Sequence, residues 1–165
     1  MNKPSTVLWR PTTTIIFIVG IVALVVYSAI AYMVTNFRPT TEVRVGSGVY
    51  HLMIADDEVE RVQGLSGVSS LKPDGGLLMR FDSDDTWGIW MKDMKIPLDI
   101  IWLNKDKKVV HMVVNASPEL STDATFTPSA AARYVIELPA GSAAKAAIKP
   151  GVTASFDETD DGRLW

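Results

Sequence analysis

The chain has 165 residues, 47% of them apolar, which is enough for one domain with its own core. It contains no cysteine, and this excludes disulfides, thiolate metal sites and cysteine nucleophiles. Residues 42–165 hold 13 of the 16 basic residues and all 19 acidic ones, which gives this part a net charge of −6. Because nucleic acid and anionic lipid headgroups repel an acidic domain, we expect no nucleic-acid partner.

The first predicted element is a transmembrane helix. Residues 15–34 read IIFIVGIVALVVYSAIAYMV, twenty residues without a charge, and a helix of this length matches the hydrocarbon core of a bilayer. Lys3 and Arg10 precede this run, and no acidic residue does. The positive-inside rule therefore predicts that residues 1–14 stay in the cytoplasm and that the chain from a linker at residues 35–41 onward lies outside.

A cleaved signal peptide is the alternative interpretation of this segment. Residues 29–31, Ala-Ile-Ala, have the small-x-small form of a cleavage site, and cleavage near Ala31 would give a secreted or periplasmic protein. The apolar run continues through residues 32–34, which favours an uncleaved signal anchor. We expect a single-pass protein of the cell membrane with its C-terminal domain outside the cytoplasm.

The rest of the sequence predicts a mainly β (α+β) domain over residues 42–156, with an acidic tail at residues 157–165. Short strands spaced by turns favour a small barrel-like or strongly curled antiparallel sheet. Residues 56–64 and 142–149 have the capping residues of two short helices. The expected strands are residues 43–45, 49–54, 77–81, 87–91, 98–103, 109–114, 133–138 and 152–156.

Residues 88–104, GIWMKDMKIPLDIIWLN, combine tryptophans with charges. Pro97 has no amide hydrogen, so KDMKIP is expected to form a turn or bulge between two strands. Asp99 follows as the one charge in a strand that is apolar on both faces, where an unpartnered carboxylate costs several kcal/mol. Either Asp99 accepts amides of the turn or pairs with Lys92, or it lines a cleft and binds a ligand.

For the other candidate side chains, the sequence favours structural roles over catalysis or ligand binding. We expect Trp90 and Trp102 to pack in the core rather than to form a ligand platform. Ser66 lies in GLSGV, which lacks the second glycine of a nucleophile elbow. His51 and His111 lie in predicted strands without neighbouring ligands, so neither a metal site nor a cofactor is expected.

Four segments carry a resemblance to a known family. They are QGLSG at residues 63–67, GGLLMRF at 75–81, WMKDMKIPLDIIWLN at 90–104 and RYVIELPAGSAAKAAIKPG at 133–151. In order and spacing they resemble the domain of unknown function 192, also called uncharacterised protein family 0127. Ser66 departs from the usual Met of that family, and Asp93-Met94 departs from Asn-Thr. The resemblance implies a compact β-rich domain, often exported, without an established activity.

The candidate ligand surface is the turn at residues 90–97 together with two carboxylates, because tryptophan faces beside carboxylates suit a sugar or a cell-wall fragment. The ligand-binding candidates are Trp90, Met91, Lys92, Asp93, Pro97, Asp99 and Glu137. We expect a non-catalytic binding or accessory module that is anchored in the membrane and recognises a carbohydrate or cell-envelope ligand.

Two other functions remain open at this point. A hydrolase would use Asp99 and Glu137 as an acid/base pair, with the two carboxyl groups about 5 to 9.5 Å apart across an open cleft. An assembly or interaction factor would work through the membrane helix itself.

Overall fold

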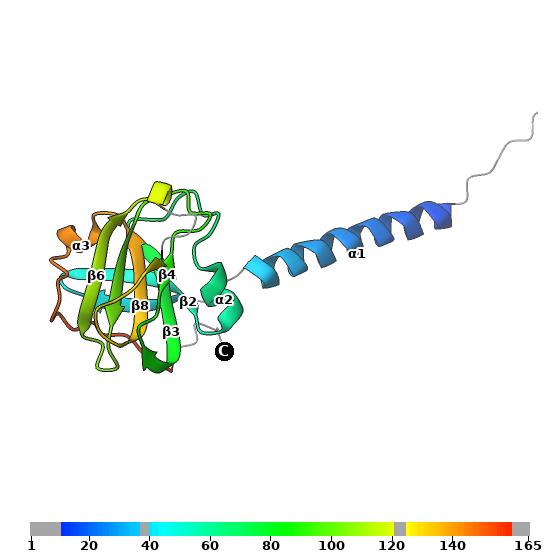
Figure 1. Cartoon of the computed structure of the whole chain (residues 1–165). Coiled ribbons are helices and arrows are strands. Elements are labelled where there is room, and N and C mark those ends of the chain that lie inside the picture. Colours follow the sequence, from blue (N-terminus) through cyan, green and yellow to red (C-terminus); the bar gives the residue numbers. More distant parts are fainter. Residues whose placement is uncertain (1–10, 37–39, 121–124, 160–165) are drawn as a thin grey trace, which may run out of the picture. The chain divides into compact units, whose positions relative to one another are not determined.

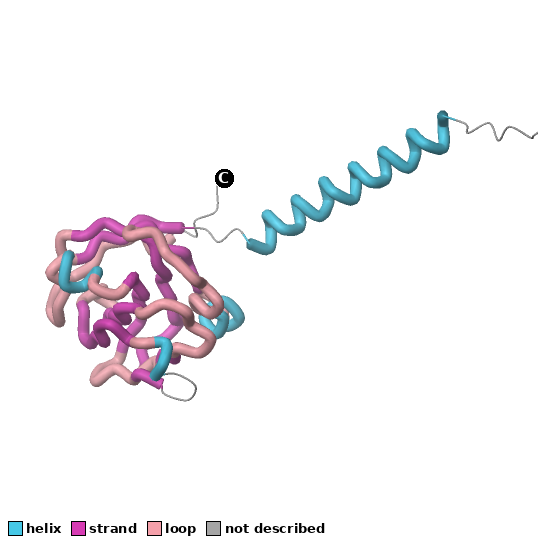
Figure 2. The backbone as a smooth tube through the Cα atoms, turned by 90° about the horizontal axis from the view of Figure 1, so that it is seen from above, coloured by secondary structure: helices cyan, strands magenta, loops and turns pink. Residues whose placement is uncertain are grey.

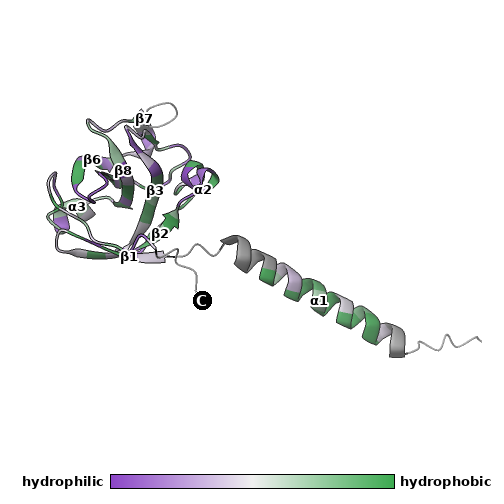
Figure 3. Cartoon of the chain, turned by 90° about the horizontal axis from the view of Figure 1, so that it is seen from below, coloured by the Kyte–Doolittle hydropathy of each residue, from purple (hydrophilic) through white to green (hydrophobic). Residues whose placement is uncertain are grey.

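The computed structural model describes residues 11–36, 40–120 and 125–159 (Figure 1), and the chain divides into two units between residues 37 and 38. The first unit holds α1 (Pro11–Asn36), a largely hydrophobic helix (Figure 3). Within the described ranges, no helix is both long enough and apolar enough to cross a membrane.

The second unit is a mixed α+β domain that is mainly β, and its short helices lie at the periphery (Figure 2). Its strands are β1 (Thr40–Val45), β2 (Gly48–Ala55), β3 (Gly75–Asp85), β4 (Ile89–Trp90), β5 (Leu98–Leu103), β6 (Val109–Ala116), β7 (Thr125–Phe126) and β8 (Ala132–Pro139). Its helical segments are α2 (Glu58–Gln63), the 3-10 turn η1 (Pro118–Leu120) and α3 (Ser142–Lys145).

Six strands form one sheet in the order β1-β2-β3-β8-β5-β6, and β4 pairs with β7 in a small second sheet. The β1–β2 hairpin is as predicted, with Gly46 at φ +60° in its turn. The prediction of an antiparallel sheet is wrong for one pair, because β2 and β3 are parallel. Parallel neighbours need a long crossover connection, and residues 56–74 with α2 provide it.

The sheet curls, but it does not close into a barrel. Residues 152–156, predicted as a strand, make only isolated bridges, Ser155 to Arg44 of β1 and Thr153 to Lys108 just before β6. The segment divides its backbone bonds between two neighbours and therefore forms a regular ladder with neither.

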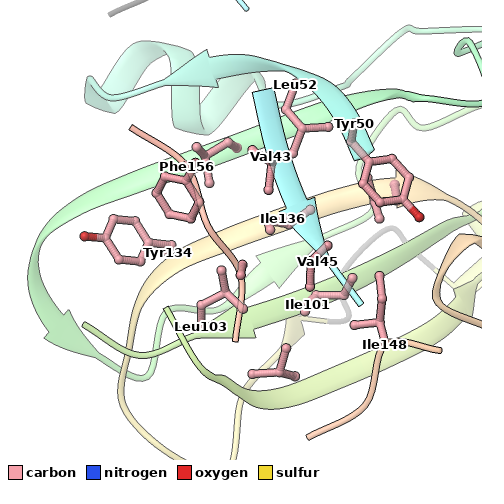
Figure 4. Close-up of a cluster of buried hydrophobic side chains, with 14 of the residues drawn as sticks. Val43, Val45, Tyr50, Leu52, Ile101, Leu103, Tyr134, Ile136, Ile148 and Phe156 are labelled. Carbon is pink, nitrogen blue, oxygen red and sulfur yellow. The ribbon is translucent and has the colours of Figure 1, made fainter. Parts of the chain in front are cut away.

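Two apolar cores lie on the two faces of the sheet. The first core contains Ile101 and Leu103 of β5 and continues to Phe156, whose ring packs edge-on against Tyr134 with the ring centroids 5.1 Å apart (Figure 4). The second core contains the alternate residues of β5, including Trp102. Because β5 has a core on each side, all six of its residues are buried. The prediction that Trp102 packs in the core is confirmed.

The two short helices lie at opposite ends of the domain (Figures 1 and 3). α2 begins after Asp57, whose carboxylate accepts a hydrogen bond from the Glu60 amide at 2.7 Å, as the sequence predicts. α3 is shorter than predicted. Ala147 adopts φ +52°, and the Ile148 amide donates to the Ala143 carbonyl at 2.9 Å, which ends the helix in a Schellman-type turn.

Asp99 joins β5 to two other parts of the fold. Its side chain is 1% exposed; Oδ1 accepts from the Asn115 amide at 2.9 Å, and Oδ2 accepts from the Ala143 amide at 2.8 Å. Asn115 lies in a bulge of β6, at φ +53°, opposite Asp99. The prediction that Asp99 accepts amides of the KDMK turn or pairs with Lys92 is wrong, because its two amide donors come from β6 and α3.

We expect Asp99→Asn to lower the free energy of unfolding by about 1.5 to 3 kcal/mol, because asparagine offers one acceptor oxygen where the carboxylate offers two charged ones. Urea denaturation of the full-length chain measures this loss. Asp106→Asn is the matched control: its carboxylate is exposed and 3.7 Å from Lys105, so its change should stay within about 0.5 kcal/mol. A loss no larger than that of the control would contradict the role of Asp99.

Candidate functional site

A cavity of about 480 Å³ opens between α2 and the strands β3 and β4. We call it the α2 pocket. It is lined by Glu58, Arg61, Val62, Gln63, Gly64, Leu65, Ser66, Met79, Phe81, Asp82, Ser83, Trp87, Gly88, Ile89, Trp90, Met94 and Glu137. Most of these residues come from α2 with the three residues after it and from the chain that runs from β3 through β4, and Glu137 is the lining residue from β8.

Three aromatic side chains line the α2 pocket. The rings of Phe81 and Trp87 are stacked with their centroids 4.3 Å apart, and the guanidinium of Arg61 lies 5.1 Å from the Phe81 centroid. Trp90 is 44% exposed, because Ile89 before it takes the buried position of the short strand β4. The Nζ of Lys92 lies 5.6 Å from the centre of the Trp90 ring. The expectation that Trp90 packs in the core is therefore wrong.

Glu137 is the buried acid of the α2 pocket. In the register of the sheet it lies beside Leu77 of β3 and Ile100 of β5, so its side chain points to the face of the sheet that carries the second core. It is 3% exposed, and its Oε2 is buried without a hydrogen-bond partner among the residues that the structure describes. Burial raises the pKa of this carboxyl from 4.5 to about 8, so it is mostly protonated at neutral pH.

The short helix α2 presents its apolar side chains outward. Val59 is 78% exposed and Val62 is 54% exposed, and none of the residues of α2 is buried. Val62 lines both the α2 pocket and a neighbouring hollow of about 500 Å³, as does Trp90. The neighbouring hollow also touches Lys92 and Asp93. Trp90 and α2 thus separate two adjoining depressions on one surface.

The predicted turn after Trp90 is fastened to the segment that follows α2. The carbonyl of Lys92 accepts from Ser66 Oγ at 2.9 Å, and the carbonyl of Asp93 accepts from the Gly67 amide at 2.9 Å. Asp93 has φ +57°, a conformation that aspartate tolerates better than most side chains. Met91 is fully buried in the second core and belongs to the packing of the domain.

The structure separates the remaining candidates. Pro97 is exposed, and its carbonyl accepts from the Ala140 amide at 3.3 Å, away from the α2 pocket. Asp99 pairs in the sheet with Leu138, whereas Glu137 pairs with Ile100, so the two acids point to opposite faces. An acid/base pair must face one open cleft, and these two carboxyl groups do not. Among the predicted candidates, the α2 pocket brings together Trp90 and Glu137.

Sequence reasoning missed the other aromatic residues of the pocket, Phe81 and Trp87. The signal that could have found the site is α2, since Val59 and Val62 on a six-residue helix with four polar neighbours indicate an apolar surface. Among the residues that the structure describes, no group of three His, Asp or Glu side chains could hold a metal ion.

Comparison with known proteins identifies the domain. The family model DUF192, described as an uncharacterized ACR, matches residues 41–156. The chain belongs to the DUF192 family. A UPF0127 protein of Thermococcus gammatolerans is 29% identical over 110 residues, which are 67% of this chain and 69% of that protein. The family resemblance expected from the sequence is confirmed.

Two solved structures share the DUF192 fold of this chain. One is a protein of Sinorhizobium meliloti described as a candidate transcription regulator, with a TM-score of 0.68 and 26% identity; the match covers 72% of this chain and 95% of that one. The other is a protein of unknown function from Novosphingobium aromaticivorans, with a TM-score of 0.66 and 27% identity, covering 70% of this chain and 84% of that one.

Glu137 should make the stability of this DUF192 domain fall as the pH rises. Between its ordinary pKa of 4.5 and its folded value of about 8, the folded chain holds a proton that the unfolded chain has released. The free energy of unfolding should therefore decrease by up to about 1.4 kcal/mol per pH unit in this range and level off above it.

Urea denaturation from pH 5 to 8 of the parent and of Glu137→Gln measures this contribution. The glutamine variant keeps the shape of the protonated side chain and should lack this part of the slope. Parallel profiles for the two proteins would contradict the assignment.

Proposed function

We propose that this DUF192 domain is a non-catalytic binding module that holds a small organic ligand in the α2 pocket. One observation carries the proposal: a half-exposed indole, Trp90, and a buried carboxyl without a partner, Glu137, line the same concave site. Ligand sites combine an apolar wall with a few polar groups in this way. The unpartnered Glu137 oxygen gains a hydrogen bond when a ligand arrives, which offsets the cost of its burial.

A carbohydrate or another fragment of the cell envelope fits this site. The rings of Trp87 and Trp90 offer flat apolar surfaces of the kind that sugar rings stack on, and Gln63 and Ser66 offer polar groups beside them. The net charge of −6 over residues 42–165 does not favour nucleic acid as the ligand.

We also propose that residues 15–34 anchor the domain outside the cytoplasm. This part of the proposal rests on the sequence, in which twenty uncharged residues follow Lys3 and Arg10. In the described part of α1, large apolar side chains from Ile15 to Ile30 are exposed, and water would solvate them poorly. An exported domain would meet cell-envelope fragments where they occur.

The binding function predicts a ligand that raises the melting temperature of the full-length chain in a thermal-shift screen of sugars and cell-envelope fragments, since a ligand of the folded state stabilises it. Trp90→Ala should weaken that ligand's affinity about tenfold or more, because stacking on an aromatic ring is lost.

Val114→Ala, which truncates an exposed side chain of β6 outside the α2 pocket, is the control and should bind as the parent does. The absence of any ligand in the screen, or equal affinity in Trp90→Ala, would argue against this use of the pocket.

The anchor predicts that the full-length chain sediments with membranes and resists extraction by high salt. A C-terminal fusion to an enzyme that is active only outside the cytoplasm should show activity. A mature protein that begins near Tyr32 would replace the anchor with a cleaved signal peptide, and a soluble cytoplasmic fusion without activity would exclude both.

A further inference from the structure

We propose that the α2 pocket selects ligands that carry an ammonium group, which pairs with Glu137. This inference rests on the proposed binding function and names the chemical class of the ligand. An amino sugar and a choline-type headgroup share this chemistry.

The charges of the described pocket lining are the first reason. Glu58, Asp82 and Glu137 supply three carboxyl groups, and the one basic side chain among the described lining residues is Arg61. The guanidinium of Arg61 donates from Nη1 to the carbonyls of Asp56 and Arg80, so it is already engaged. The charge that the pocket lacks is a positive one.

The aromatic rings are the second reason. A cation is attracted to the face of an aromatic ring, and sites for ammonium ligands are commonly built from such rings. Two rings of this surface already carry cations of the chain itself, Arg61 over Phe81 and Lys92 over Trp90. Trp87 and Trp90 line the cavity in which Glu137 lies, so an ammonium group there meets both an indole and a carboxylate.

The buried carboxyl is the third and independent reason. Glu137 is only 3% exposed, yet its Oε2 has no hydrogen-bond partner within the described part of the chain. Its neighbours in the sheet, Leu77 and Ile100, are apolar and cannot satisfy it. An N–H of an ammonium group, or the positive face of a quaternary one, would give this oxygen its missing partner.

Pairing with a cation requires the ionised form of Glu137. The protonated carboxyl releases its proton to solvent when the ammonium group enters, so up to one proton leaves for each ligand bound. The charged groups of the described lining that face the cavity are Glu58 and Arg61 from α2 and Asp82 from β3. β4 contributes the apolar Ile89 and Trp90 to the lining, and the neighbour of Glu137 in β5, Ile100, is also apolar. Since burial raises the pKa of Glu137 to about 8, affinity for a cation should rise as the pH rises toward that value.

The test compares two probes of the same shape, choline and its neutral isostere 3,3-dimethyl-1-butanol. The charge of choline does not titrate, so any pH dependence belongs to the protein. The full-length chain is kept in a polyoxyethylene detergent, which contains neither sugar nor ammonium groups, and binding is measured by isothermal titration at pH 6, 7 and 8.

Choline should bind more tightly than the isostere, and its affinity should rise by up to about tenfold per pH unit between pH 6 and pH 8. About one proton should be released per choline bound at pH 6 and about half a proton at pH 8, where Glu137 is already partly ionised. Proton release is read from titrations in buffers with different ionisation enthalpies. Glu137→Gln should lose the preference for choline and its pH dependence. The control Glu119→Gln, which changes an exposed carboxylate of η1 outside the α2 pocket, should keep both. If Glu137→Gln does not fold, the number of protons released by the parent and the pH dependence of its choline affinity still test the proposal.

A second matched pair identifies the source of the ammonium group. A higher affinity for glucosamine than for N-acetylglucosamine would indicate an amino sugar. A higher affinity for choline than for either sugar would indicate a choline-type headgroup. Equal binding of choline and its isostere, or binding of neutral sugars alone, would overturn the ammonium proposal and leave the pocket as a binding site. If none of these four probes and none of the envelope fragments of the screen binds, both the ammonium proposal and the proposed binding function are overturned.

Discussion

The carboxylate of Asp99 holds together three parts of the chain that are distant in sequence. β5 carries it, the bulge of β6 donates one amide to it, and the first turn of α3 donates another. Its charge also acts on Tyr50, whose pKa is raised mainly by burial and to a smaller extent by the negative charge of Asp99. Without this carboxylate, two backbone amides would lack this acceptor, and α3 would lose the bond that fixes its start over the first core.

Neighbouring positions of one sheet thus give two acids opposite roles. Asp99 lies on the face that α3 covers and finds two amide donors there, so its charge is fully used by the fold. Glu137, in the next register pair, points to the face on which α2 leaves a cavity, and no described residue donates a hydrogen bond to its Oε2. The difference comes from what each face of the sheet packs against, and it leaves Glu137 as the buried acid with an unsatisfied oxygen.

The sequence predicts the local structure well where one residue type dictates it. Asp57 and Gly64 delimit α2, Gly46 turns the first hairpin, and the run of residues 98–103 is a buried strand. The pairing of distant strands, such as the parallel β2 and β3, is set by the crossover and is not encoded in either strand. The exposure of Trp90 depends on the two-residue strand β4, in which Ile89 takes the buried position and Trp90 the exposed one. Two residues are too few to show a periodicity in the sequence.

The divided bonding of residues 152–156 has a consequence for aggregation. β1 and β6 are the edge strands of the sheet, and exposed edges offer unpaired amides to other chains. The segment bonds Arg44 on one edge and Val109 on the other, and the ion pair of Lys107 with Glu158, at 3.0 Å, holds the chain just beyond it. A single stretch of chain therefore shields part of both edges, and the sheet resists edge-to-edge association without being closed.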